Sequence, residues 1–304
     1  MIGKNKYALM EYKGSTDSNG TRKQQNYITD HMTDSDRRYI RIADKTFLAC
    51  IVLELAGMFT MFLWGTLGAQ MAIYAMTFAM AWLVARKNKN IHIPIGKMEP
   101  KQTVLCLGIT ICGIPIAMLL NAFASVLSSS QSSGMEDTTV YPFWLSLICL
   151  AIVPAVIEEY IFRGVILGAY LKMETMAAVL ISSLFFGLLH FSLGSVMYGF
   201  FFGCVFALIR VITGNIAYTM LMHVTFNSLN VLLEYVNIGA VPIWVVLAVM
   251  LVCIVGFVAL MKKLLHETSI HVEKKRHKIR HLMTREGYVA VGICVVIMGM
   301  LLCE

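Results

Sequence analysis

AVIEEYIFRGVI, residues 155–166, places Glu158, Glu159 and Arg163 inside a stretch that otherwise has the composition of a membrane-spanning helix. An ionised side chain at the centre of such a helix costs about 2.5 to 3.5 kcal/mol on translocon-type scales. Three charges so close together must therefore be paired with one another or serve a function. The rest of the chain indicates which of them does which.

The composition is that of a polytopic membrane protein. Of the 304 residues, 58% are hydrophobic and 14% are charged, which is far more apolar than a soluble globular chain. Apolar segments near 20 residues recur, and each is long enough to cross a hydrocarbon core of about 30 Å. We therefore predict an all-α bundle of about eight or nine transmembrane helices. The nine segments are approximately 47–66, 68–85, 102–124, 142–162, 176–193, 196–212, 215–234, 240–261 and 287–303.

Basic residues predict how this bundle lies in the membrane. Nine lysines and arginines precede residue 46, five lie in the 86–101 loop and eight in the 262–285 loop. Lys and Arg in short loops stay on the cytoplasmic side, and a nine-span path with a cytoplasmic N-terminus places all three groups there. The C-terminus is then predicted outside. This distribution explains the net charge of +7 without a nucleic-acid partner.

The predicted domain organisation is simple. Residues 1–46 are polar and are expected to form a cytoplasmic tail without a packed core of its own. Residues 47–304 are expected to form a single transmembrane domain. We therefore predict a multi-pass protein of the cell membrane.

Polar side chains within the predicted spans are few, and they are regularly spaced. Six of the eight histidines lie in the tail or the inner loops, whereas His190 and His223 lie in spans, within FFGLLHF and LMHVTFN. Asn227 follows His223 by one helical turn, so both project from the same helix face. Phe186 precedes His190 by the same interval and is expected to form the wall beneath its imidazole.

The spacing within the first motif separates the two glutamates. Glu159 and Arg163 are i,i+4 with the acid first, which is the favourable order for an ion pair on one helix face. Glu158 points about 100° away and can face a different cavity. A buried carboxylate without a cation suits a general base. Glu159 and Arg163 are then expected to support the site structurally.

Three helices therefore supply Glu158, His190, His223 and Asn227. If these side chains converge, they provide a pair that activates water and two hydrogen-bond donors for a developing oxyanion. That is the minimum equipment for hydrolysis of a peptide bond.

These motifs resemble those of a known family. The order Glu158-Glu159-x-x-x-Arg163, Phe186-x-x-x-His190 and His223-x-x-x-Asn227 is similar to that of the CPBP (Abi) family, the CAAX protease and bacteriocin-processing intramembrane peptidases. The Gly-containing stretch GNIAYTMLMHVTFN before the last motif also resembles the family. The resemblance covers about residues 142–235.

The resemblance implies an all-helical membrane fold with a polar intramembrane cavity that opens to the inner membrane face or to lipid. It implies that Glu158 polarises the attacking water, that His190 shares the proton, and that His223 and Asn227 hold the oxyanion. The implied partners are membrane-embedded or lipidated peptide substrates.

A metal is an open alternative at this stage. Glu158, His190 and His223 could act as three ligands of a catalytic zinc ion, and the family has often been described as metalloproteases on that ground. The histidines, however, come from separate helices without an H-E-x-x-H pair, and Asn227 is a poor zinc ligand but a good oxyanion donor. We therefore favour a glutamate-dependent mechanism without a metal cofactor.

Three classes of function fit the pattern. The first is an intramembrane endopeptidase that acts on membrane-associated peptides or proteins. The second is a bacteriocin immunity or scaffold protein that binds a partner without cutting it. The third is an ion-coupled transporter, which would be expected to show broken helices in two corresponding halves of the chain. The polar residues lie in one central third, which favours the first class.

Overall fold

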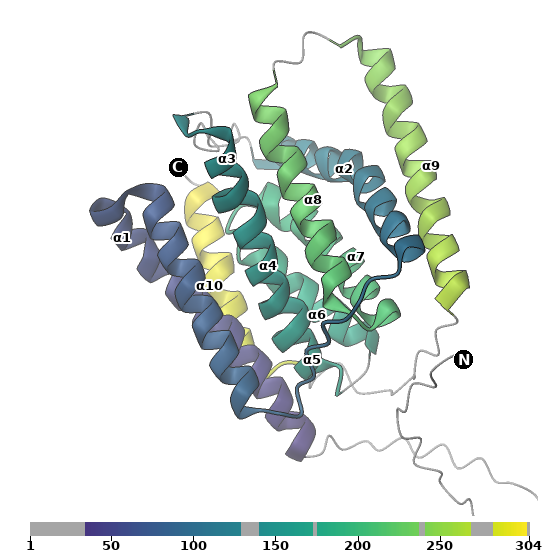
Figure 1. Cartoon of the computed structure of the whole chain (residues 1–304). Coiled ribbons are helices and arrows are strands. Elements are labelled where there is room, and N and C mark those ends of the chain that lie inside the picture. Colours follow the sequence, from purple (N-terminus) through teal and green to yellow (C-terminus); the bar gives the residue numbers. More distant parts are fainter. Residues whose placement is uncertain (1–33, 129–139, 173–174, 237–240, 269–281, 303–304) are drawn as a thin grey trace, which may run out of the picture. The chain divides into compact units, whose positions relative to one another are not determined.

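The computed structural model describes residues 34–128, 140–172, 175–236, 241–268 and 282–302, without the side chains of 34, 35 and 59–64. All of them belong to one compact unit, Met32–Glu304. Within these ranges every regular element is a helix (Figure 1). The predicted all-α bundle is confirmed, while residues 1–33 of the predicted tail lie outside the described part.

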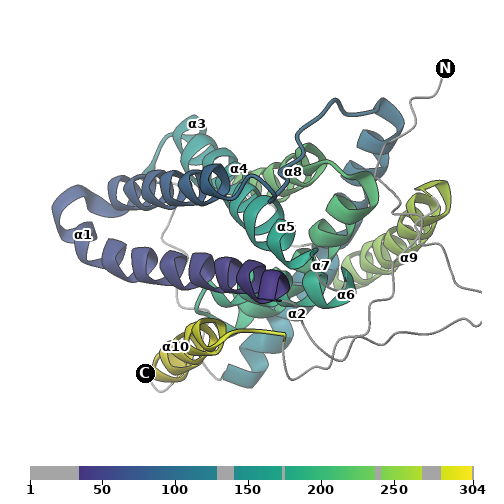
Figure 2. The ribbon, with the colours of Figure 1, turned by 90° about the horizontal axis from the view of Figure 1, so that it is seen from below.

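The first helix, α1 (Asp34–Lys87), consists of two halves joined at Gly65. Gly65 has φ 67° and ψ 173°, which a residue without a Cβ atom adopts readily. The chain reverses there, and Figure 2 shows the two halves side by side. The helix begins before the predicted boundary at residue 47, because Ile40, Ala43 and Phe47 are spaced along one helix face and are buried.

Seven described helical segments are long and apolar enough to cross a membrane. They are Gly65–Lys87 of α1, α2 (Pro100–Ser128), the composite helix Phe143–Tyr170, α7 (Leu193–Thr213), α8 (Ile216–Tyr235), Ile243–Glu267 of α9 (Ile243–Thr268) and α10 (Arg285–Leu302). The predicted span at 176–193 corresponds to α6 (Thr175–Leu188), whose 14 residues cover about 21 Å. The predicted span at 47–66 lies in the first half of α1, which is not among the seven.

The composite helix carries the motif with three charges. It is built from α3 (Phe143–Ser146), η2 (Leu147–Ile152), α4 (Val153–Glu159), η3 (Tyr160–Ile166) and α5 (Leu167–Tyr170). The two η segments are π-helical, a local widening that is frequent at functional sites. Glu158 and Glu159 end the α-helical segment between them, so both glutamates lie where the helix changes its pitch.

Helices α6 and α7 pack with their backbones in contact. A Cβ atom on Gly203 would lie 2.9 Å from the Cβ of Ser183, and one on Gly187 would lie 2.8 Å from the carbonyl oxygen of Val196. Real Cβ atoms do not approach so closely, so the contact requires glycine at both positions. This close approach fixes the turn that carries His190 against the rest of the bundle.

A capped turn places the start of α8. Gly214 ends α7 with φ 65°, the left-handed conformation of a helix C-cap. The side chain of Asn215 accepts a hydrogen bond from Ala217 N at 3.0 Å and so caps α8. Its oxygen also accepts from Gly96 N at 3.1 Å, which ties the turn to the 88–99 connection. The turn thereby fixes where α8 begins in the bundle, and with it the position of His223.

Asp44 joins the first half of α1 to the last helix. Its buried carboxylate accepts hydrogen bonds from Thr284 N at 2.6 Å, Thr284 Oγ1 at 2.7 Å and the hydroxyl of Tyr170. Burial raises the pKa of Asp44, and the hydrogen bonds from Thr284 and Tyr170 offset part of that rise. Because Thr284 directly precedes α10, the contact holds the beginning of that helix.

Candidate active site

The four side chains predicted to be catalytic line one cavity. Its volume is about 430 Å³, and its walls include Glu158 from α4, His190 from the turn after α6, and His223 and Asn227 from α8. Segments that are up to 69 residues apart in the chain therefore meet at one place. The convergence on which the hydrolytic hypothesis depends is present in the structure.

Glu158 reaches the cavity. Among the described residues, no Lys or Arg lies within ion-pair distance of its carboxylate. Its side chain is 11% exposed. Oε1 accepts a hydrogen bond of 3.0 Å from the hydroxyl of Tyr74, which comes from the second half of α1. Oε2 lies 3.9 Å from Nε2 of His223. One carboxylate oxygen is thus held by a neutral donor while the other faces an imidazole.

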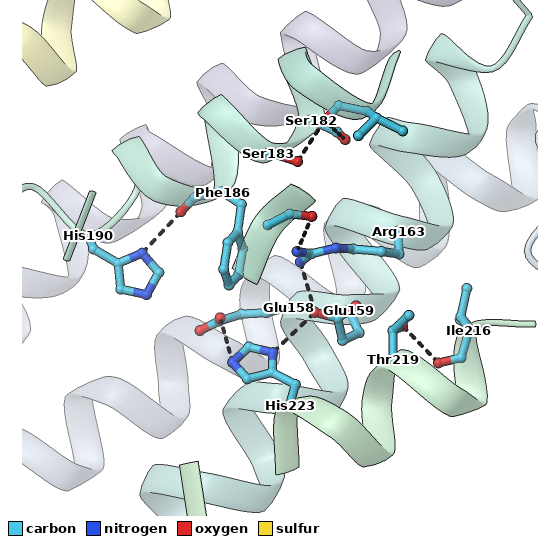
Figure 3. A network of polar contacts seen from close by, with 12 residues as sticks. Glu158, Glu159, Arg163, Ser182, Ser183, Phe186, His190, Ile216, Thr219 and His223 are labelled. Carbon is cyan, nitrogen blue, oxygen red and sulfur yellow. Dashed lines mark hydrogen bonds and ion pairs between the residues drawn. The ribbon is translucent and has the colours of Figure 1, made fainter. Parts of the chain in front are cut away.

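Glu159 points the other way and is fully buried (Figure 3). Its Oε1 atom accepts from Nη1 of Arg163 at 2.8 Å, so the ion pair expected from the i,i+4 spacing is present. The same oxygen lies 3.1 Å from Nδ1 of His223. Glu159 therefore links the cation on its own helix to the imidazole on α8.

Arg163 is enclosed by protein on all sides. Its Nη2 atom donates to the carbonyl oxygen of Gly203 at 3.2 Å. The guanidinium carbon lies 4.2 Å from the ring centre of Phe186 and 5.3 Å from that of Phe206, both within the range of cation–π attraction. The arginine thus fastens α6 and α7 to the motif helix.

His223 is oriented by its contact with Glu159. A carboxylate oxygen accepts hydrogen bonds, so Nδ1 of His223 is the donor in the 3.1 Å contact. Nε2 is then the ring atom that faces Glu158. Its ring packs against Phe186 with the centres 5.6 Å apart, which restricts rotation. A carboxylate that fixes one imidazole nitrogen and aims the other at the reacting atoms is a common device in hydrolytic sites.

His190 is more exposed than the other site residues and follows the end of α6. Its Nδ1 atom donates to the carbonyl oxygen of Phe186 at 3.0 Å, so Nε2 is free for proton exchange. The ring of Phe186 lies 5.4 Å from the His190 ring and forms its wall, as the spacing predicts. The next residue, Phe191, has φ 53°, an uncommon conformation for a bulky side chain, and strain of this kind is frequent beside active sites.

Two features of the site were not predicted from the sequence. One is Tyr74, a tyrosine in an apolar span more than 80 residues before Glu158. The other is the contact between Glu159 and His223. Spacing along one helix indicates pairs within that helix, whereas both of these contacts join separate helices.

The described side chains at the site do not form a three-ligand group for zinc. Catalytic zinc needs three protein ligands around one point. Within the described ranges, no group of three or more His, Cys, Asp or Glu side chains could hold a metal ion. Glu158, His190 and His223 line one cavity without forming such a group.

Comparison with known proteins identifies the central segment. Residues 140–229 match a family model described as type II CAAX prenyl endopeptidase Rce1-like. The match includes all three motifs, and it confirms the resemblance to the CAAX protease family. No curated protein and no solved structure matches the chain significantly. The match favours an intramembrane endopeptidase, while the walls contributed by α1 and by the end of α8 lie outside the matched segment.

Proposed function

We propose that this chain, whose residues 140–229 match the type II CAAX prenyl endopeptidase Rce1-like model, is an intramembrane endopeptidase that cuts membrane-embedded or lipidated peptides. The observation that carries the proposal is the different setting of two adjacent carboxylates. Glu159 is paired through Oε1 with Arg163 and His223, whereas Glu158 faces the cavity with an imidazole beside it. A site that needed charge pairing alone would have no reason to leave one carboxylate without a cation.

The chemistry follows from that difference. Glu158 takes a proton from a water molecule in the cavity, and the hydroxide oxygen attacks the carbonyl carbon of the scissile bond. A tetrahedral intermediate forms, and the negative charge collects on the former carbonyl oxygen. The carbon–nitrogen bond then breaks, and the leaving nitrogen receives the proton through Glu158 and Nε2 of His190. The products are a free carboxylate and a free amine.

The oxyanion is stabilised by groups from α8. The amide of Asn227 donates one hydrogen bond, and Nε2 of His223 donates the other when the ring carries both protons. Donors placed in advance around a developing charge supply a large share of the rate of such reactions, since the loss of one costs about 10²–10³ in kcat. Glu159 holds the His223 ring in position for this role.

The proposed mechanism uses no metal ion. The carboxylate and the imidazoles account for water activation and proton transfer, and the described donors form no three-ligand group. Because the mechanism needs no metal, activity of the purified protein should survive extended treatment with a zinc chelator. Loss of activity with recovery on adding zinc would contradict the mechanism.

We further propose that the N-terminus is cytoplasmic and the C-terminus outside.

The test compares membrane peptides from cells that produce wild type, Glu158→Gln or His190→Ala. Glu158→Gln keeps the size of the side chain and removes its basicity. We expect a set of cleavage products in wild-type membranes that is absent with Glu158→Gln and reduced with His190→Ala. Glu99→Gln makes the same chemical change on an exposed residue of the 88–99 connection and serves as the matched control.

The alternatives predict different results. A scaffold or immunity protein would show identical peptides in all four strains and an unchanged phenotype with Glu158→Gln. A transporter would show a change in ion flux without new peptides. Either result with normally folded protein would contradict the proposed protease.

A further inference from the structure

Basic side chains gather at one end of the bundle, which we call the basic end. The described lysines and arginines, Arg163 excepted, lie in the first four turns and the last turn of α1, in the 88–99 connection, at the starts of α2 and α10, just after α5, and near the ends of α7 and α9. Direct contacts join several of these segments. Lys101 lies 3.0 Å from Glu267, Arg41 lies 3.8 Å from Glu286, and Asn90 donates to the Tyr39 hydroxyl at 2.9 Å.

The opposite end, which we call the far end, has no such charge. It comprises the turn at Gly65, the end of α2, the start of α3, the end of α8 and the start of α9. Described residues 65–75, 120–128, 140–152, 227–236 and 241–250 contain no Lys or Arg. By the positive-inside rule the basic end is cytoplasmic and the far end is extracytoplasmic.

The active-site cavity extends toward the far end. Helix α8 starts at the basic end and carries four polar cavity-lining side chains, His223, Asn227, Asn230 and Glu234. Their spacing of four, three and four residues places them in one stripe on a single helix face. From His223 to Glu234 the stripe rises about 16 Å at 1.5 Å per residue. It ends one residue before α8 does.

The other walls of the cavity agree with this direction. The second half of α1 begins at the far end, and it contributes Leu67, Gln70 and Tyr74, all from its first three turns. Tyr141, just before α3, also lines the cavity. Glu158 and His223 thus lie at the deep end of the cavity. From there the walls formed by α1, α8 and Tyr141 lead toward the far end.

We infer that the scissile segment reaches Glu158 from the extracytoplasmic face, along the polar stripe of α8. The substrate class is therefore an exported or membrane-anchored polypeptide whose cleaved segment lies on the outer side of the membrane. The side-chain amides of Asn227 and Asn230 both donate and accept hydrogen bonds, as an extended backbone requires. A height of about 16 Å accommodates about five extended residues. This direction differs from the opening toward the inner face that the family resemblance implies, and it names the substrate of the proposed protease.

Cysteine labelling in intact cells tests the direction without relying on catalysis. Asn230→Cys and Glu234→Cys place thiols on the stripe, and Lys89→Cys places one in the 88–99 connection at the basic end. Each full-length variant is treated with a membrane-impermeant maleimide before and after permeabilisation. Wild type gives the background, which should be low because its described cysteines are buried or half-buried.

We expect Asn230→Cys and Glu234→Cys to be labelled in intact cells and Lys89→Cys to be labelled after permeabilisation. Labelling of both stripe positions after permeabilisation alone would overturn the inference, and so would no labelling of either under both conditions. Glu234→Cys, nearer the end of α8, keeps the test decisive if Asn230→Cys fails to fold. Since no step requires cleavage, a protein without protease activity can still give either result, so failure of the proposed function and failure of this inference are distinguishable.

Discussion

Loss of Arg163 should destabilise the protein far more than loss of a typical side chain. In Arg163→Met the carboxylate of Glu159 stays fully buried and keeps His223 as its hydrogen-bond partner without the cation. Removal of one partner from a buried ion pair costs about 3–5 kcal/mol, since the other charge is left without compensation. The bond to the carbonyl of Gly203 adds about 0.5–1.5 kcal/mol. Methionine keeps much of the apolar contact with the two phenylalanine rings, so the loss reflects the charge.

The double variant Glu159→Gln/Arg163→Met separates charge from packing. Replacement of both members of a buried pair by neutral side chains of similar volume is often close to neutral for stability. We therefore expect the double variant to regain more than half of the stability that Arg163→Met loses. Its activity should stay low, because glutamine orients His223 less firmly than a carboxylate does.

Unfolding in mixed micelles with increasing denaturing detergent measures these differences. The single variant should unfold at a clearly lower fraction of denaturing detergent than wild type, with the double variant between them. A wild-type midpoint for Arg163→Met would show that the ion pair does not hold the motif helix. A double variant no more stable than the single one would show that packing of the guanidinium, and not the charge left on Glu159, is what matters.

Three further changes test the surroundings of the site. Tyr74→Phe removes the hydroxyl that donates to Glu158, the proposed base, so kcat should fall about tenfold or more with KM unchanged. Tyr160→Phe makes the same change on a residue outside the cavity and should leave kcat unchanged. Gly203→Ala forces a methyl group against the α6 backbone and should cost about 1–3 kcal/mol in detergent unfolding, whereas Gly292→Ala meets no neighbour and should not. Burial raises the pKa of Asp44 above its ordinary 3.8, so the folded protein holds that proton more tightly than the unfolded chain does. Wild type should therefore lose thermal stability relative to Asp44→Asn as the pH rises from 3.8 through the raised pKa. A gain in stability relative to Asp44→Asn over that pH range would contradict this sign.

The sequence predicted those parts of the site that depend on one helix. The i,i+4 interval between Glu159 and Arg163 brings those side chains together in any helix, and the π-helical turns do not disturb the pair. The same interval placed Phe186 beneath His190. Such contacts are local, so they follow from the chain without knowledge of its packing.

Contacts between helices were beyond the sequence pattern. Tyr74 reaches Glu158 because the reversal at Gly65 returns the second half of α1 along the motif helix. The predicted boundary between the spans 47–66 and 68–85 marks that reversal, but it does not indicate which helix the second half of α1 packs against. The length of α6 was overestimated. Residues 189–192 are apolar enough to extend a helix, but the chain turns there and the turn carries His190.

The direction of the cavity depends on both kinds of information. Charge counts along the chain predict which loops share a membrane side, and a stripe of polar residues on α8 is visible in the sequence as an interval of four, three and four. Neither indicates that Leu67, Gln70 and Tyr141 complete a wall on the same side of Glu158, because these residues are separated from α8 by 75 positions or more. In the proposed protease, the motif residues supply the chemistry. The elements outside the matched segment, which build the wall above it, determine from which side of the membrane a substrate can reach that chemistry.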